Sequence, residues 1–532
     1  MLGFPMEMVV SKLEACQKRL VHWSGNSFCH MRWEIIEKKK LLKVAESEAA
    51  QGRQMDRFLK LKSNIVDLFW LDEKMWQQCS KEHWMISEDR NSKYLHTRAS
   101  QCFHRNTIME LRNPEGVLVS SDGDISAMVQ DYYKNVFLSS RLTKVDDVVL
   151  SIKPAVIDDM NNHLINSFSQ AKIECALSQM APLKAPGPDG VPPIFFQKFW
   201  SVVGDDVVRA MLFCLNSGSL HPGLNHTFIS LIPKFKNPQY VTKFRPIALY
   251  NILYKLVSKV LAKKLKNVLP HIISESQSTF QSNKEISNNI LVAFETLHHM
   301  KRKKGGKSGH LALKLDISKA YDRLEWVFLK KVMERMGFHS QWVGWIMECV
   351  QSMTYLVLIN GEPTETITPS RGIRQRDPLS PYLFLLCLDG FSGLLEQVVA
   401  KKSLEGFSLC KYGPKICHLL FANNSLLFCW ARVNDVSKIL EILRKYERAS
   451  GQKLKANKTT IFFGGNVMDS AKMQVQSLLG VSEIKEYENY LGLPVVVGRH
   501  KKASFNYIKN HFGVNFKGGR KKFYPKPERR FC

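Results

Sequence analysis

The 532-residue chain lacks several patterns that assign a protein class early. Its twelve cysteines include no Cys-x-x-Cys pair, and the chain has no internal repeat and no low-complexity segment. A disulfide-rich secreted domain is therefore disfavoured, and reduced thiols in the cytosol or nucleus fit best. The nearest candidate for a metal-ligand cluster is Cys410, Cys417 and His418. Because two of these are adjacent and no fourth ligand is near, we interpret the cysteines as small core residues.

The sequence also lacks a secretion signal and a long uninterrupted apolar run. Residues 1–20 have no basic segment ahead of an apolar core, and the longest apolar run, residues 381–395, is interrupted by Asp389. That run is shorter than the roughly 20 residues that a membrane-spanning helix needs. We therefore expect no membrane partner and an intracellular location, nuclear or cytoplasmic.

What the chain does have is positive charge. It carries 76 Lys and Arg against 48 Asp and Glu, a formal net charge of +28. An excess of this size favours a polyanionic partner, and nucleic acid is the first candidate. The alternative is a basic surface that binds nothing, and charge names no reaction. With 45% apolar residues the chain can build real cores, and its length predicts roughly two to four domains.

The first 110 residues have the composition and spacing of long polar helices. We expect the tryptophans of this region to pack against partners rather than to stack on bases; they are Trp23, Trp33, Trp70, Trp76 and Trp84. Residues 183–193 contain too much Pro and Gly for the interior of a helix or strand. This stretch marks either a boundary or an ordered loop.

A helix is predicted after residue 250, with an apolar stripe and a lysine face. The apolar stripe consists of Leu256, Val260, Leu261, Leu265 and Val268. The lysines are Lys255, Lys259, Lys263, Lys264 and Lys266. Such a face could lie along a phosphate backbone, and a merely solvated face is equally common.

Further along, strands, hairpins and helices alternate without a regular βαβ pattern. Residues 310–316 alternate as a strand that ends at Asp316, on the face opposite its leucines. Asn360-Gly361 predicts a hairpin turn, and residues 434–450 predict a helix that ends before Gly451. Residues 417–430 read as strand, two-residue turn and strand, with Asn423 and Asn424 in the turn. This mixture favours an α+β fold, an antiparallel sheet with helices on one side.

Asp316 is the first candidate for chemistry, because a strand end can hold a metal ligand rigidly. A capping aspartate is the competing interpretation. The surrounding blocks decide between them: "LKLDISKAYD", "SRGIRQRDPLSPYLF", "HLLFANNSLLF" and "YLGLPVVVGR" follow one another in the chain. This ordered series resembles the reverse transcriptase of non-LTR (LINE-type) retrotransposons, most closely the plant members. The resemblance covers roughly residues 181–499.

The resemblance implies an α+β right-hand polymerase fold, with an antiparallel palm sheet and helices. Residues 171–500 would form fingers and palm, and residues 1–170 a mostly helical connector. Residues 501–532 would be a truncated basic tail where a thumb would begin, so the thumb is largely missing. The implied partners are an RNA template, a DNA primer and deoxynucleoside triphosphates, and the oligomeric state stays open.

The resemblance also implies roles for single residues around two Mg²⁺ ions. Phosphoryl transfer of this kind uses two divalent metals about 4 Å apart. Asp316 would bridge both ions, Tyr321 would lie under the incoming sugar, and Gln375 would border the same pocket.

Three basic residues match family positions near the triphosphate. Lys234 and Arg245 would neutralise the triphosphate, and Lys458 would protonate the leaving pyrophosphate. For each of them, plain surface charge is the competing interpretation.

Two departures from the family pattern bear on activity. The family hairpin reads Phe-Ala-Asp-Asp, and this chain has Asn423 and Asn424. One of three acidic groups is left for two ions of total charge +4, and Mg²⁺ depends on carboxylates, so metal binding should be impaired. Arg376 replaces a family Gly and should crowd the nucleotide pocket.

The sequence therefore predicts a degenerate reverse transcriptase-like domain that is catalytically inactive. The alternatives are residual RNA-directed DNA synthesis, a non-catalytic remnant that binds RNA or DNA, and a chain that does not fold stably.

Overall fold

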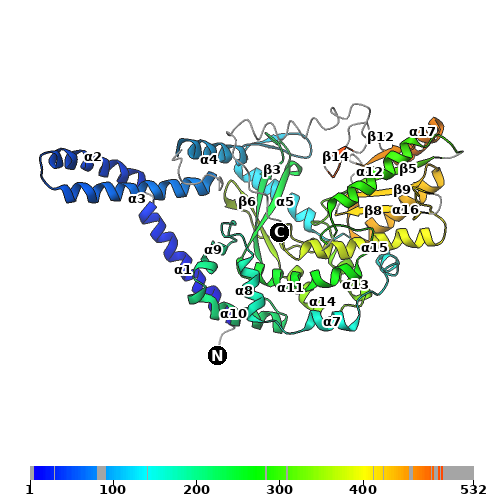
Figure 1. The fold of residues 1–532 in the computed structure, drawn as a ribbon, viewed down its shortest axis with the longest axis horizontal. Coiled ribbons are helices and arrows are strands. Elements are labelled where there is room, and N and C mark those ends of the chain that lie inside the picture. Colours follow the sequence, from blue (N-terminus) through cyan, green and yellow to red (C-terminus); the bar gives the residue numbers. More distant parts are fainter. Residues whose placement is uncertain are drawn as a thin grey trace. The chain divides into compact units, whose positions relative to one another are not determined.

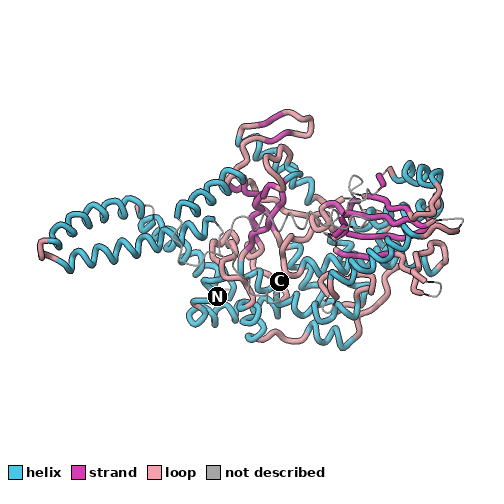
Figure 2. The backbone as a smooth tube through the Cα atoms, turned by 45° about the horizontal axis from the view of Figure 1, so that its top comes forward, coloured by secondary structure: helices cyan, strands magenta, loops and turns pink. Residues whose placement is uncertain are grey.

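The computed structural model describes residues 5–28, 30–80, 92–140, 142–281, 284–306, 309–410, 413–422, 424–454, 459–480, 482–483, 489–491 and 493–494. The fold is α+β, with helices and mostly antiparallel sheets (Figures 1 and 2). The chain forms two compact units, each assembled from three segments. Unit 1 comprises Met1–Leu138, Ile165–Lys263 and Gly344–Leu379, and unit 2 comprises Ser139–Leu164, Lys264–Val343 and Ser380–Cys532.

Unit 1 is built on a four-stranded sheet with the order β4-β3-β6-β7. The strands are β3 (His226–Pro233), β4 (Phe244–Tyr250), β6 (Thr354–Ile359) and β7 (Glu362–Pro363). β3 is antiparallel to β4 and parallel to β6. The predicted turn between β6 and β7 is confirmed: Asn360 and Gly361 have φ of +52° and +103°, as a type I′ turn requires.

Helices make up the rest of unit 1, together with the short pair β1 (Leu111–Arg112) and β2 (Leu118–Val119). The helices are α1 (Pro5–Phe28), α2 (Met31–Ala50), α3 (Met55–Ser80), α4 (Ser92–Asn106), α5 (Asp122–Phe137), α8 (Gln170–Ser178), α9 (Pro193–Lys198), α10 (Trp200–Ser217) and the 3₁₀ turn η1 (Val241–Lys243). Three further helices run across the division between the units: α7 (Asp158–Ile165), α11 (Ile252–Ile272) and α14 (Ser340–Gln351). α2 packs against α3, α3 against α4, and α1 against α10.

The N-terminal tryptophans differ in how far the chain itself buries them. Trp23, Trp33 and Trp70 are 56%, 65% and 54% exposed, so they are not buried within this chain, and their packing against a partner stays a prediction. Their helices bury narrower faces made of smaller aliphatic side chains. Trp76 is half-buried and donates a hydrogen bond to Asp72 at 3.0 Å. Trp84 lies outside the described residues.

The Pro- and Gly-rich stretch 183–193 is an ordered loop within unit 1. A Cβ on Gly187 would come within 2.4 Å of the Asn251 nitrogen, so only glycine allows this approach of the two backbones. The Asn251 side chain accepts a hydrogen bond from the Asp189 backbone N–H at 3.1 Å. These contacts hold the loop against the start of α11.

The predicted stripe of α11 is confirmed, because all five of its apolar residues are buried. The lysine face differs from both expectations, since Lys266 is the only one of the five lysines that is exposed. Lys264 donates to the Leu164 carbonyl at 2.9 Å. Lys255 lies 4.7 Å from the centre of the Tyr250 ring, and burial lowers its pKa to about 8. Most of this face is therefore packed in protein.

Unit 2 is built on a sheet with the order β12-β11-β5-β9-β8, and β10 also pairs with β5. The strands are β5 (His310–Ser318), β8 (His418–Phe421), β9 (Asn424–Trp430), β10 (Lys453–Leu454), β11 (Thr460–Phe463) and β12 (Ser482–Glu483). All pairs are antiparallel except β11 with β12. β13 (Asn489–Tyr490) and β14 (Leu493–Pro494) form a separate antiparallel pair. β5 continues two residues past Asp316, so Asp316 is not the end of its strand as predicted.

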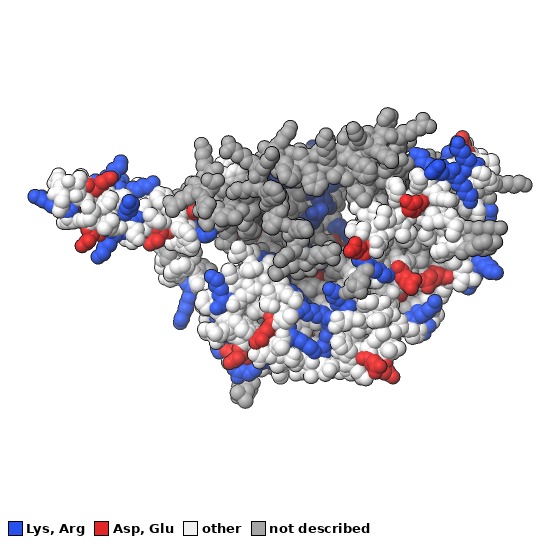
Figure 3. Space-filling view, in the orientation of Figure 1, with Lys and Arg blue, Asp and Glu red and all other residues white. Residues whose placement is uncertain are grey.

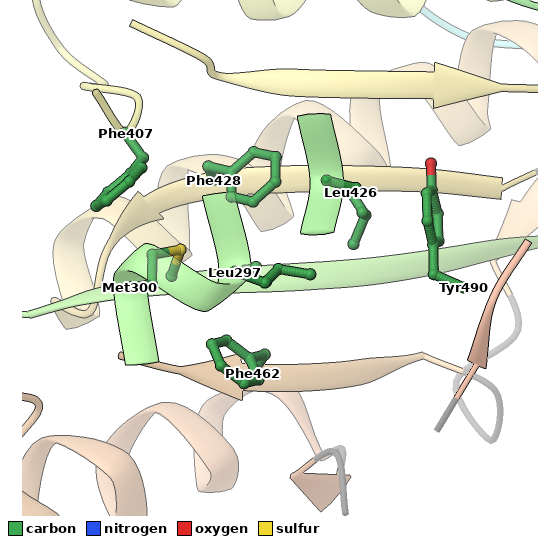
Figure 4. Packing of buried hydrophobic residues seen from close by; sticks show 9 residues of the cluster. Leu297, Met300, Phe407, Leu426, Phe428, Phe462 and Tyr490 are labelled. Atoms are coloured by element: carbon green, nitrogen blue, oxygen red, sulfur yellow. The ribbon is translucent and has the colours of Figure 1, made fainter. Parts of the chain in front are cut away.

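The helices of unit 2 lie on both faces of this sheet, rather than on one side as predicted. They are α6 (Val145–Val149), α12 (Ile286–Arg302), α13 (Trp326–Met336), α15 (Ser380–Ala400), α16 (Val433–Ser450) and α17 (Asp469–Leu479). On one face, Leu297 and Met300 of α12 pack with Phe428 and Phe462 of the sheet (Figure 4). On the other face, Leu315 of β5 lies with residues of α15 and α16, Phe391 and Leu443 among them. As predicted, α16 ends before Gly451, which has φ of +75°.

α15 corrects the expectation about the apolar run at 381–395. The helix has 21 residues, so by length and composition it could cross a bilayer. Most of it is buried inside unit 2, and the core helix of a globular domain passes the same test. One such helix is weak evidence for a membrane span.

A buried histidine anchors the start of β8. His418 Nε2 is 2.8 Å from the Ser276 hydroxyl and 2.8 Å from the Ser392 hydroxyl, so the ring is within hydrogen-bonding distance of both. Ser276 follows α11 and Ser392 belongs to α15. Burial lowers the pKa of His418 to about 4. The hairpin is thereby tied to two other elements of unit 2 by an uncharged imidazole.

We predict that this histidine makes unit 2 sensitive to acid. The unfolded chain protonates His418 near pH 6.5 and the folded chain near pH 4, so stability is lost as pH falls through this window. The unfolding free-energy difference between wild type and His418→Gln should shrink by about 2 kcal/mol from pH 7.5 to pH 5. Urea unfolding at both pH values measures this, with the exposed His271→Gln as control. An unchanged difference would contradict the assignment.

Candidate functional site

The register of β5 and β9 brings two of the candidate residues together. Asp316 is paired directly with Asn424 across the antiparallel ladder. Residues directly opposite each other project from the same face, with Cβ atoms about 4.5–5.5 Å apart. Both side chains are half-buried. They share this face with Ala312 and Phe428, which pack under α12, so the packed core of the face ends next to them.

The hairpin turn lies one residue earlier than the sequence predicts. Phe421 pairs with Asn424, so the two-residue loop consists of Ala422 and Asn423. Ala422 has φ of +50°, the conformation of the first loop position of a type I′ turn. Asn424 is the first residue of β9. Because side chains alternate along a strand, this shift is what places Asn424 on the face of Asp316. Asn423 lies outside the described residues.

The side chains on this face do not fit a site for two magnesium ions. Within the described strands 310–318, 418–421 and 424–430, Asp316 is the single acidic residue. Throughout the described part of the chain, no group of three or more His, Cys, Asp or Glu could hold a metal. A carboxylate and a neutral amide supply one negative charge, whereas two Mg²⁺ ions bring four positive charges and are normally held by carboxylates. No chemical step through a metal therefore follows from this arrangement.

Tyr321 is held in a fixed position three residues after β5. Its ring stacks on Phe384 of α15, with centroids 5.1 Å apart and an angle of 18° between the rings. Burial raises the pKa of its phenol to about 12, so the group is neutral. Gln452 donates to the carbonyl of Ala320 at 2.9 Å and secures the turn before it. Tyr321 is thus packed against α15, and its place under an incoming sugar stays a prediction.

The remaining described candidates belong to unit 1. Lys234 directly follows β3, and its amino group donates to the Thr242 carbonyl at 2.8 Å. Arg245 is exposed in β4 and pairs with Ile232. Lys234 and Arg245 therefore lie at the same end of one strand pair. Lys458 lies outside the described residues.

Gln375 and Arg376 sit in a loop that a buried cation holds in place. The guanidinium of Arg374 lies 4.5 Å from the ring centre of Tyr250 and 4.6 Å from that of Tyr254. It also pairs with Asp377 at 3.4 Å, and both side chains are almost completely buried. Stacked, desolvated contacts of this kind strengthen a cation–π interaction.

Asp377 completes the network around this loop. It accepts hydrogen bonds from the backbone N–H of Leu379 at 2.9 Å and from the hydroxyl of Ser258. Arg374 donates to the Asn225 carbonyl at 3.2 Å. Sequence reasoning missed this network. The one signal in the sequence was the pair Tyr250 and Tyr254, four residues apart. Tyr250 ends β4 and Tyr254 lies in the first turn of α11.

Arg376 adopts a backbone conformation that suits glycine. Its φ is +68°, and its carbonyl accepts a hydrogen bond from the Tyr250 hydroxyl at 3.1 Å. Its side chain is exposed. For a residue with a Cβ, the left-handed region costs roughly 1–2 kcal/mol. The strain comes from the backbone, whereas the predicted crowding of a nucleotide pocket stays a prediction.

Comparison with known sequences identifies the family. Residues 232–506, just over half of the chain, match the family described as reverse transcriptase (RNA-dependent DNA polymerase). The chain belongs to the reverse transcriptase family. The matched range contains all of the candidate site residues, from Lys234 to Lys458.

Two of the relatives below are named as proteins of transposable elements. The chain is 25% identical over 446 residues to the transposon TX1 uncharacterized 149 kDa protein of Xenopus laevis, covering 84% of this chain and 32% of that one. It is 25% identical over 325 residues to the Pol polyprotein of the type-2 retrotransposable element R2DM of Drosophila melanogaster, covering 59% and 29%. An uncharacterized mitochondrial protein of Arabidopsis thaliana is 47% identical over 75 residues, covering 14% and 62%.

This reverse transcriptase-like chain is a domain of the non-LTR retrotransposon type. It spans about a third of the length of the TX1 and R2DM proteins.

We predict that Arg376→Gly stabilises unit 1. Glycine adopts positive φ without a clash, and this gain exceeds the entropy it adds to the unfolded chain. The free energy of unfolding should rise by about 0.5–1 kcal/mol. Chemical denaturation measures it. Gln375→Gly is the matched control, since φ of Gln375 is not positive, and it should lower stability. Equal effects of the two substitutions would be inconsistent with backbone strain at 376.

Removing Asp377 should destabilise unit 1 strongly. Asp377→Ala leaves the Arg374 cation buried without its counter-charge, which costs about 3–5 kcal/mol. Asp131→Ala, at an exposed position of α5, should change stability by less than about 0.5 kcal/mol. Guanidinium unfolding followed by tryptophan fluorescence compares the two. A small effect of Asp377→Ala would mean that the tyrosine rings alone hold the guanidinium.

Proposed function

We propose that this chain is the polymerase region of a non-LTR reverse transcriptase, related to the plant members, that has lost its metal site and no longer extends primers. The observation that carries the proposal is the pairing of Asp316 with Asn424 across β5 and β9. This pairing places two side chains as close together as a metal-bridging carboxylate and a second metal ligand must be. The second side chain is Asn424, which has an amide where the family has a carboxylate.

The proposal assigns parts of the polymerase to the two units. The unit 2 sheet with Asp316 corresponds to the palm, and the unit 1 sheet with Lys234 and Arg245 to the fingers. The helices up to residue 170 correspond to the connector, and the region after residue 500 to the beginning of a thumb. Tyr321 and Gln375 would line the nucleotide pocket. These assignments rest on the family membership and on the position of each residue in its matched block.

The loss of activity follows from charge, because the fold at this position is intact. Asparagine has nearly the shape of aspartate, and its oxygen can still touch a metal, but it carries no charge. Two Mg²⁺ ions held by one carboxylate would repel each other, because one negative charge offsets only a quarter of their positive charge. Removal of essential groups that act as a unit usually costs several powers of ten in rate.

A second function, nucleic-acid binding without catalysis, is favoured by the net charge of +28. RNA template, DNA primer and nucleotides are the partners that the family implies. An RNA-binding remnant would keep a strongly salt-dependent affinity, because counterions are released from the phosphate backbone. Its proposed location is intracellular, in the nucleus or cytoplasm.

Primer extension on an RNA template tests the proposal. The wild-type chain should give no extension product with Mg²⁺, while retaining salt-sensitive RNA binding. The variant Asn423→Asp, Asn424→Asp and Arg376→Gly should give measurable extension, because it restores two carboxylates, which make three with Asp316, and the family glycine. Extension by this variant should require the carboxylate of Asp316. The extension product should therefore disappear when Asp316→Asn is added to the same variant.

Two results would count against the proposal. Mg²⁺-dependent extension by the wild-type chain would show that the amides do not abolish catalysis. No extension by the restored variant, with RNA binding intact, would show that the metal site is not the main defect.

A further inference from the structure

The α3 helix presents an apolar stripe that the described residues of unit 1 leave exposed. Met55, Leu59, Val66 and Trp70 are 52%, 52%, 43% and 54% exposed. Their spacing of four, seven and four residues puts them along one line of an α-helix. The line is about 22 Å long, at 1.5 Å per residue. Single exposed apolar residues are ordinary, but an aligned set on one helix indicates a contact surface.

This stripe is a second face of α3, separate from the face that packs against α2 and α4. The antiparallel pair of helices α2 and α3, residues 31–80, is called the arm below. The inner face of α3 packs against α2 and α4 and includes the buried Ile65 and the half-buried Phe58 and Phe69. Ile65 and Val66 are neighbours in sequence and so point about 100° apart. The fold of the arm therefore does not need the stripe.

The arm is poorly suited to nucleic acid. Residues 31–80 contain ten Lys and Arg and eight Asp and Glu, against the excess of 28 positive charges in the whole chain. Figure 3 shows both signs interspersed on the arm formed by α2 and α3, at the left of the view. A phosphate backbone is bound by clustered positive charge, which this arm lacks. Mixed charge beside an apolar stripe instead suits a protein partner.

The charges along one flank of the stripe are opposite in sign to those that they would meet on a second, antiparallel copy of α3. This flank carries Asp56, Lys60, Asp67 and Lys74, whose signs alternate. In an antiparallel pair of α3 helices centred near residue 65, Asp56 faces Lys74 of the second copy and Lys60 faces Asp67. The same alignment sets Trp70 against Leu59 and Val66 against the small, exposed Ser63. Lys74 already lies at the edge of the stripe, 5.7 Å from the Trp70 ring centre.

We infer that α3 is a homodimerisation helix, and that two copies of this chain associate through antiparallel α3 stripes. The two-fold axis passes near residue 65, so the interface is formed by the same residues of both copies. The apolar stripe supplies the contact area, and the alternating flank sets the antiparallel direction, as flanking charges do in coiled coils. The inference does not depend on whether the polymerase site is active.

Light scattering on the full chain measures the association over roughly 1–50 µM protein. The mass of the wild type should rise with concentration from 61.1 kDa toward twice that value. Leu59→Glu and Trp70→Glu should weaken dimerisation roughly tenfold or more, because each puts a charge in the seam. Both residues are about half exposed, so circular dichroism should show unchanged helix content. Phe103→Glu is the matched control, at a 69% exposed position on a different helix, α4, and should dimerise like the wild type.

Charge reversal tests the antiparallel direction. Asp56→Lys and Lys74→Asp should each weaken the dimer, because each creates like-charged pairs. The double variant should dimerise like the wild type, because every pair is again of opposite sign. A monomeric wild type at all concentrations would overturn the proposal, as would a double variant no better than the single ones. Loss of single-stranded RNA binding in Leu59→Glu and Trp70→Glu, with a monomeric wild type, would overturn it in favour of a nucleic-acid surface.

Discussion

The antiparallel pairing of β5 with β9 is the constraint on which the candidate site depends. It aligns seven residue pairs, from His310 with Trp430 to Asp316 with Asn424. Both faces of the sheet are buried along most of this length, so the register cannot slip by one residue. Such a slip would turn Leu313 and Leu315 toward α12 and drive Lys314 into the apolar layer under α15 and α16. The backbone therefore fixes position 424 opposite Asp316, whichever side chain stands there.

In unit 1 the loop with Gln375 and Arg376 is fixed by a buried cation and not by strand pairing. This loop, residues 374–379, has no strand partner to fix it, and the buried Arg374 takes that role between two tyrosine rings and Asp377. A buried charge is costly unless it is paired and hydrogen-bonded, and here the counter-charge and the hydrogen bonds come from neighbouring segments. The network also keeps Arg376 in a conformation that its side chain disfavours. The strain is confined to residue 376, and the stabilisation from the surrounding contacts is larger than its cost.

Much of this could be predicted from the sequence, since the strongest local signals agree with the fold. The alternation of leucines located β5, the Asn360-Gly361 pair located a hairpin, and Gly451 located the end of α16. Other features depend on contacts far away in sequence. The turn at 422–423 follows from burial of Leu420 and Leu426, which outweighs the preference of an Asn pair for the turn. The packing of the α11 lysines and the ring contacts of Arg374 need partners that no local pattern reveals.

The one-residue difference in the turn has a consequence for how this chain can change over generations. Because Ala422 takes the positive φ and the buried strands hold the register, the hairpin places no demand for an amide at position 424. Asparagine and aspartate codons differ by a single base. Aspartate at position 424 is therefore one ordinary mutation away, and selection on folding alone has no reason to prefer either residue.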